Sequence, residues 1–191
     1  TSADGATIGS ASKEFSDLFL ADGSTIQFGN DQEITLTHVA DSGLILKHTA
    51  TGDDSTVSLT LQTGETDIQA NDVIGKIDFQ APDEAQGTDA VLVAAGIEAV
   101  SEGDFSTSSN ATKLSFKTGA SEAAAEKMAL SSGGNLTVTG DITAGDDIVL
   151  DSDAAVLKFG DDQDITVTHV ADTGLTMKNT STTGNSGVGA V

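Results

Sequence analysis

The chain has 191 residues, of which 30 are acidic and eight are basic, giving a formal net charge of −22. This balance argues against binding to nucleic acid or to an anionic membrane surface, because both need clustered Lys and Arg. The absence of Cys excludes disulfides and thiolate metal sites, and no apolar run approaches the ~20 residues of a membrane span. With seven Phe and neither Trp nor Tyr, one copy has few large side chains for a core. We therefore expect an obligate oligomer.

Taken in chain order, residues 1–14 are expected to be a linker or a disordered start. Residues 15–65 then form a first β unit. Within it, residues 34–39 and 57–61 alternate apolar and polar side chains, the pattern of a strand with one buried face. Asp41-Ser-Gly43 separates two short strands and predicts a hairpin.

A different β segment is predicted over residues 66–140. Residues 74–79 and 114–116 alternate, and the apolar run from residue 90 to 95 fits a buried strand. Residues 131–135 form a turn that predicts a hairpin over residues 126–139. Residues 121–125 contain strong helix formers, for which we expect at most a helical turn followed by a strand.

Part of the first unit is written twice. Residues 28–51 and residues 159–182 are identical at 16 of 24 aligned positions, at a constant offset of 131 residues. Residues 165–170 therefore repeat the strand pattern of 34–39, and residues 136–138 alternate just before this second copy. We expect residues 141–191 to be a second, incomplete copy of the first unit. Reuse of a large unit along one chain is typical of extended, stacked structures.

The two copies place a histidine at the same position, His38 and His169. On an alternating strand His38 shares a face with Ile34 and Leu36. If that face lay at a symmetry axis between chains, several imidazoles would converge there and could bind a metal or an anion, or respond to pH. The ordinary alternative is a packed histidine satisfied by hydrogen bonds.

Acidic turns are the other candidate for a metal. Clustered carboxylates suit calcium, which prefers oxygen ligands, although none of these turns matches an EF-hand loop. The default for such residues is a solvated turn, so we expect no cofactor and keep structural calcium as the alternative. The candidate ligands are Asp53, Asp54, Asp146, Asp147, Asp161 and Asp162.

Catalysis is not expected. The sequence has neither a G-x-S-x-G nucleophile motif nor an H-E-x-x-H metal motif, and it contains three histidines, two of which are repeat equivalents. A glycosidase pair of carboxylates would ordinarily lie in a groove with aromatic platforms, and the chain lacks Trp and Tyr. We therefore predict no catalytic residues and no enzyme activity.

In the middle segment, residues 75–79 read GKIDF, residues 94–99 AAGIEA, residues 113–117 KLSFK and residues 126–136 EKMALSSGGNL. These motifs resemble the tail-fibre and tailspike proteins of tailed phages, where similar text precedes a C-terminal intramolecular chaperone. The flanking units, with Gly-Asp-Asp and Thr-His-Val-Ala-Asp, resemble fibre repeats of marine phages. Lys127 and Ala129 stand where the family has arginines, and the repeated unit follows in place of a chaperone.

This resemblance implies an elongated, intertwined β-structure of β-prism or triple β-helix segments, in a parallel homotrimer with little helix. It implies a structural shaft of a virion tail fibre that positions a host-recognition tip. Its partners would be further copies of itself, arrayed end to end, other fibre or baseplate proteins and, indirectly, the host cell surface. The alternatives are a self-polymerising bacterial filament, extracellular or on the cell surface, and a glycan-binding receptor module.

Overall fold

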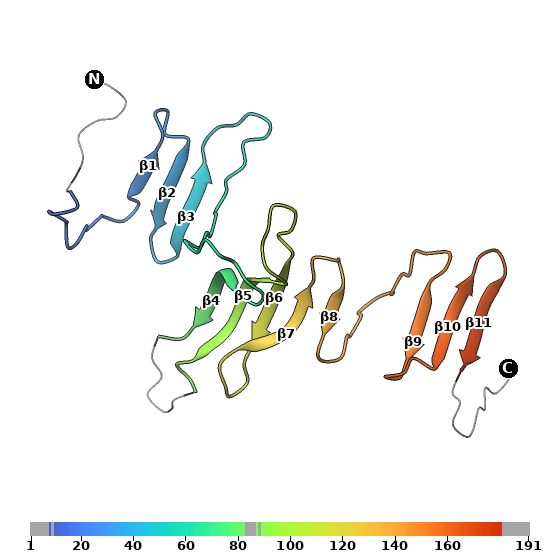
Figure 1. Cartoon of the computed structure of the whole chain (residues 1–191). Helices are drawn as coiled ribbons and strands as arrows, with labels where there is room; N and C mark the ends of the chain where they lie inside the picture. Colours follow the sequence, from blue (N-terminus) through green and yellow to red (C-terminus); the bar gives the residue numbers. More distant parts are fainter. Residues whose placement is uncertain (1–7, 9, 83–86, 88, 181–191) are drawn as a thin grey trace. The chain divides into compact units, whose positions relative to one another are not determined.

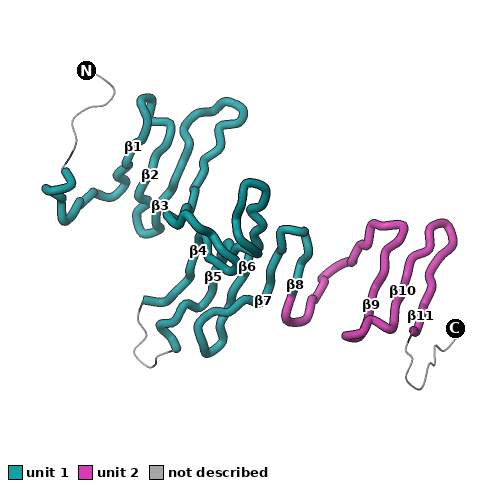
Figure 2. The backbone as a smooth tube through the Cα atoms, viewed as in Figure 1, with its two compact units in different colours: residues 1–137 teal, residues 138–191 magenta. Residues whose placement is uncertain are grey.

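The computed structural model describes residues 8, 10–82, 87 and 89–180 (Figure 1). Eleven strands form three antiparallel sheets, and the described residues contain no helix, as the all-β prediction requires. The chain divides into two compact units, Thr1–Thr137 and Val138–Val191 (Figure 2). Of the predicted linker at residues 1–14, residues 1–7 and 9 lie outside the described residues, and Ser10 and Lys13 form an isolated bridge.

The first sheet contains β1 (Thr25–Phe28), β2 (Ile34–Val39) and β3 (Gly43–His48), in that spatial order. The hairpin between β2 and β3 is confirmed, and it turns through Asp41 at φ 59° and Gly43 at φ 145°. Asp and Gly tolerate positive φ, which explains why the chain reverses there. β1 was not predicted, because four residues are too short to establish a period.

The middle sheet is built from five strands in chain order, each paired with the next. One strand prediction is wrong here: residues 57–61 lie outside every strand of the structure, although they alternate. The strand expected from the apolar run 90–95 is present, but it begins at Val93 and extends to Ser101. Residues 121–123 form bends, and a strand follows from Ala125. The strands are β4 (Val73–Gln80), β5 (Val93–Ser101), β6 (Thr112–Thr118), β7 (Ala125–Leu130) and β8 (Leu136–Val138).

The third sheet contains β9 (Val156–Phe159), β10 (Ile165–Val170) and β11 (Gly174–Asn179). It reproduces the first sheet residue for residue, because every pair in its register lies 131 positions after a pair of the first. The turns correspond as well: Gln32 and Gln163 both have φ 54°. The repeat is therefore structural, and it extends upstream of the duplicated text to include β1 and β9.

The described residues have very little core. Their buried hydrophobic side chains are Val100, Ala124 and Ala129, all small or medium in size. Large apolar side chains remain open to solvent, such as Phe28 at 51% exposure and Leu44 at 69%. A sheet with one apolar face normally buries that face against a second layer of structure. In this chain the sheets form, and most of their apolar surface stays uncovered.

Candidate association surfaces

The first sheet gathers most of its large apolar side chains on one face. Residues directly opposite one another across an antiparallel ladder lie on the same face, so the register identifies its members. His38 lies there with Ile34 and Leu36, as strand alternation predicts. We call this surface the histidine face; it comprises Ile26, Phe28, Ile34, Leu36, His38, Leu44, Leu46 and His48.

The third sheet repeats the histidine face. Each of its six large apolar residues is replaced, if at all, by another large apolar residue, and neither version contains a formal charge. The opposite face changes at fewer positions but less conservatively: Thr25 becomes Val156, Gln27 becomes Lys158 and Ile45 becomes Thr176. The two copies therefore preserve the apolar, uncharged character of the histidine face, whereas the opposite face exchanges polar, apolar and charged residues. The third-sheet version comprises Leu157, Phe159, Ile165, Val167, His169, Leu175, Met177 and Asn179.

The opposite face is mostly polar, although it also carries Val39 and Ile45. Thr25 and Thr37 lie opposite each other, and their hydroxyl oxygens are 3.0 Å apart. Thr35, which lies opposite Gln27 on one side and Lys47 on the other, is 7% exposed. Solvent-facing threonines with hydroxyl pairs are a stable outer surface for a sheet. This leaves the histidine face as the side that needs a covering layer.

His38 has a carboxylate partner in its own chain. Its Nδ1 lies 3.6 Å from Oδ1 of Asp22, and the His38 side chain is 38% exposed. In the second copy, Asp153 stands at the position equivalent to Asp22, although every other residue of that four-residue turn differs. His48, at the far end of the same face, accepts a hydrogen bond from the backbone N–H of Ala50. Both histidines are thus ordinary polar residues at the rim of an apolar surface.

The middle sheet also separates charge from apolar side chains. Its charged face carries three ion pairs: Lys76–Asp78 at 2.5 Å, Lys113–Glu126 at 2.7 Å and Lys117–Glu98 at 3.3 Å. Between these long side chains the small residues Ser115 and Ala129 are 0% and 7% exposed. The hydrogen bond from Lys113 lowers the pKa of Glu126 below its ordinary value. The opposite face is apolar and bears Ile77, Phe79, Ile97, Leu114, Phe116, Met128 and Leu130.

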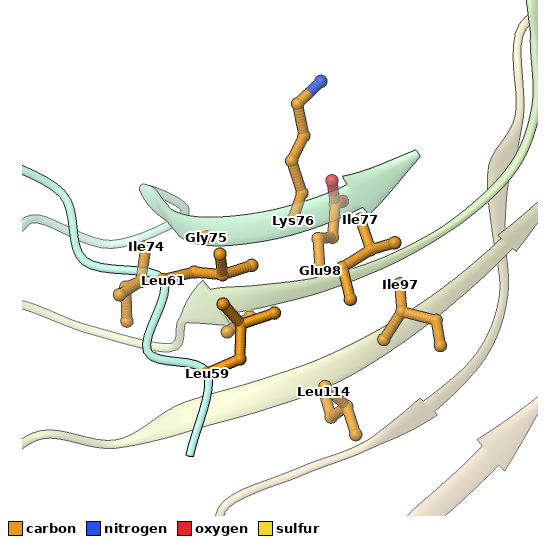
Figure 3. A pocket seen from close by; sticks show the side chains of 10 residues that line it. Leu59, Leu61, Ile74, Gly75, Lys76, Ile77, Ile97, Glu98 and Leu114 are labelled. Atoms are coloured by element: carbon orange, nitrogen blue, oxygen red, sulfur yellow. The ribbon is translucent and has the colours of Figure 1, made fainter. Parts of the chain in front are cut away.

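Residues 57–61 lie over the β4 end of this apolar face. Leu59 and Leu61 line a groove of about 250 Å³ together with Ile77, Ile97 and Leu114, and Lys76 points away from it (Figure 3). Gly75 makes the approach feasible, because a Cβ at that position would lie 3.0 Å from the Cβ of Leu61. The groove is open, and Leu59 is 70% exposed. Its lining is mostly apolar, with Lys76 and Glu98 as the charged members.

The predicted calcium ligands do not meet. Among the described residues, no three His, Asp or Glu side chains form a group that could hold a metal. Asp54 has φ 64° in a turn, and Asp146 accepts a hydrogen bond from the backbone N–H of Asp147 at 3.0 Å. Asp53 adjoins Asp54 in the first of these turns, and Asp161 precedes Asp162 in the loop between β9 and β10.

Each repeat has a pair of carboxylates, Asp31 with Glu33 and Asp162 with Asp164, whose shared turn was not predicted from the sequence. Asp162 and Asp164 both approach Gly160, and in the first copy Glu33 approaches Gly29. The Glu33 side chain lowers the pKa of Asp31 by hydrogen bonding. The signal in the sequence was the preserved acidity of Glu33 and Asp164 within the duplicated block. Two carboxylates and a glycine at φ 87° in both copies define a repeated turn.

No family model, curated protein or solved structure matches the chain. Within the described residues, no helix is long and apolar enough to span a membrane.

Proposed function

We propose that this protein is a structural component of a phage tail fibre or a similar virion appendage, and that it forms a rigid trimeric shaft that positions a host-recognition tip. The observation that carries the proposal is the uncovered histidine face, present with the same register in two sheets of one chain. A surface of this kind is completed by other chains. The trimer and the virion setting come from the resemblance of the middle segment to tail-fibre proteins.

Charge supports contact between copies through these faces. Chains with a net charge of −22 repel one another wherever carboxylates meet. The histidine faces carry no Asp, Glu or Lys, so two copies approach there without burying a charge. The Lys-bearing faces, with Lys47 in the first sheet and Lys76 in the middle one, then remain in water. This arrangement gives an apolar interior and a charged exterior.

The mechanism is mechanical. Paired strands set a fixed length for each unit, and packing between copies supplies the rigidity that the isolated sheets lack. The shaft would hold a distal tip away from the particle and transmit its position to the neck or baseplate. No reacting group is required, and the groove beside Leu59 is lined mainly by apolar side chains.

Light scattering on the purified chain tests this proposal. We expect a mass three times the 19.2 kDa of one chain, unchanged on dilution over the micromolar range. Electron micrographs of the same sample should show thin rods of one length. A compact monomer at every concentration would refute the proposal. A mass that grows without limit would favour the self-polymerising filament instead.

A further inference from the structure

We propose that residues 57–62 act as an intermolecular strand, which pairs with the free edge of β3 in a second copy of the chain. The inference rests on the proposed function, because it requires copies to be held together. It adds a specific partner and a specific contact: backbone hydrogen bonds between a segment of one chain and a sheet edge of another.

The backbone of this segment is unpaired in a single chain. Within the described part of the protein, no hydrogen bond involves an N–H or C=O group of residues 57–62. Ser58 and Thr60 alternate with Val57, Leu59 and Leu61, which is the sequence pattern of a strand. Leu59 and Leu61 line the same side of one groove, as residues two apart do in an extended chain. The segment therefore has the sequence pattern of a strand, but in a single chain its backbone forms no hydrogen bonds to a neighbouring strand.

The edge of β3 offers a matching set of backbone groups. In the described sheet β3 pairs on one side, with β2. The backbone N–H of Thr49 bonds to the carbonyl of Glu33, so residues 45 and 47, in the same phase as Thr49, also bond toward β2. Leu44, Leu46 and His48 alternate with these and direct their N–H and C=O groups outward. Three backbone N–H donors and three backbone C=O acceptors thus lie along the free edge of this six-residue strand.

The two elements match in side-chain chemistry as well as in length. On β3 the apolar residues Leu44 and Leu46 lie on the histidine face, and Lys47 lies on the other. A paired segment would place Leu59 and Leu61 beside them and Ser58 and Thr60 on the polar face. The segment has no charged residue, so the contact itself buries no charge, although each chain carries −22. Unprotected edges of this kind commonly pair with another chain.

A second copy is the fitting partner because each chain already holds its own segment elsewhere. Leu61 packs at Gly75 on the middle sheet, and Leu59 lies beside it over the same face (Figure 3). These side chains anchor the segment to its own chain while its backbone stays available. Each chain could then add its segment to the β3 edge of one neighbour and receive another neighbour's segment on its own β3 edge.

Amide hydrogen exchange on the assembled full-length chain tests the inference. We expect alternate amides within residues 57–62, together with those of Leu44, Leu46 and His48, to exchange about a hundredfold more slowly than in the dissociated chain. Amides of β2, which pair on both sides in one chain, give the reference for full protection. An oligomer in which residues 57–62 exchange freely would overturn the inference and leave the proposed function standing. A monomer with these amides protected would overturn both.

Proline substitutions supply a second, independent test. Thr60→Pro and Leu61→Pro each remove one N–H, on opposite sides of the segment, and neither N–H has a partner in a single chain. Thr60→Ala and Leu61→Ala remove the same side chains and keep the N–H groups. If the segment pairs, one proline variant dissociates at a concentration at least about tenfold higher than its alanine counterpart does. If both proline variants assemble like their alanine counterparts, the inference is wrong.

Discussion

Alanine substitutions at two neighbouring residues of β3, Leu44 and Ile45, should have different effects on stability in a single chain and in an assembly of copies. Leu44 lies on the histidine face and is 69% exposed in a single chain, whereas Ile45 lies on the opposite face and is 50% exposed. Fully burying a Leu or Ile side chain is worth about 1.5–3 kcal/mol. Judged from one chain, Leu44→Ala should therefore cost about 0.5–1 kcal/mol and Ile45→Ala about 1 kcal/mol, with Ile45 equal or larger.

Covering of the histidine face by another copy reverses this order. Leu44 then becomes a core residue, and its truncation leaves a cavity that costs about 2–5 kcal/mol per chain. Ile45 remains at the surface and keeps its cost of about 1 kcal/mol. The assay is equilibrium unfolding in urea of both variants at two protein concentrations, with the oligomeric state followed in parallel.

The result that refutes this reasoning is also clear. If Leu44→Ala unfolds at the same urea concentration as Ile45→Ala, or at a higher one, in a sample shown to be oligomeric, the histidine face is not part of the contact. In the second copy Leu44 is kept as Leu175, whereas Ile45 is replaced by Thr176. We therefore expect Leu44→Ala to be the more destabilising of the two substitutions.

Two further predictions follow from local geometry. The hydrogen bond from Lys113 lowers the pKa of Glu126 below 4.5, so its stabilising effect is complete above that pH and is lost as pH falls through the lowered value. Urea midpoints should therefore fall further between about pH 5 and about pH 3 in the parent than in Glu126→Gln, and equal falls would contradict this. Gly29→Ala forces a side chain into φ 87° and should cost about 1–2 kcal/mol, whereas Gly64→Ala, in open space, should leave the urea midpoint unchanged.

Much of the fold could be predicted from period and turns. Strict alternation located β2 and β10 to the residue, and the Asp-Ser-Gly turn after β2 gave its hairpin. Residues 57–61 show the limit of this reasoning. Alternation reports that a segment suits a sheet, yet whether it joins one depends on a partner strand, which a single chain does not provide. Residues 121–125 contain strong helix formers but form no helix, because β7 pairs with β6 from Ala125 onward.

The candidate association surfaces could also be predicted in part from the alternation of apolar and polar residues. The face shared by His38, Ile34 and Leu36 followed from alternation alone. Its other members, such as Phe28 and Leu46, required the register across three strands, which depends on the turns as well as on the strands. The approach of Glu33 to Gly29 was not predictable, because it arises from the left-handed backbone at Gln32 and Gly29.

Because the two three-stranded sheets are nearly identical, copies of the chain could align with one another in more than one axial register. A histidine face hardly distinguishes its counterpart in another chain from the sheet 131 residues away. Two alignments then compete, one with all chains level and one with a chain slipped by a whole unit. The β4–β8 sheet occurs once in the described residues and breaks this degeneracy, because a slipped chain would set it against the wrong neighbour. In such an assembly, the unrepeated middle sheet would fix the axial register of the copies.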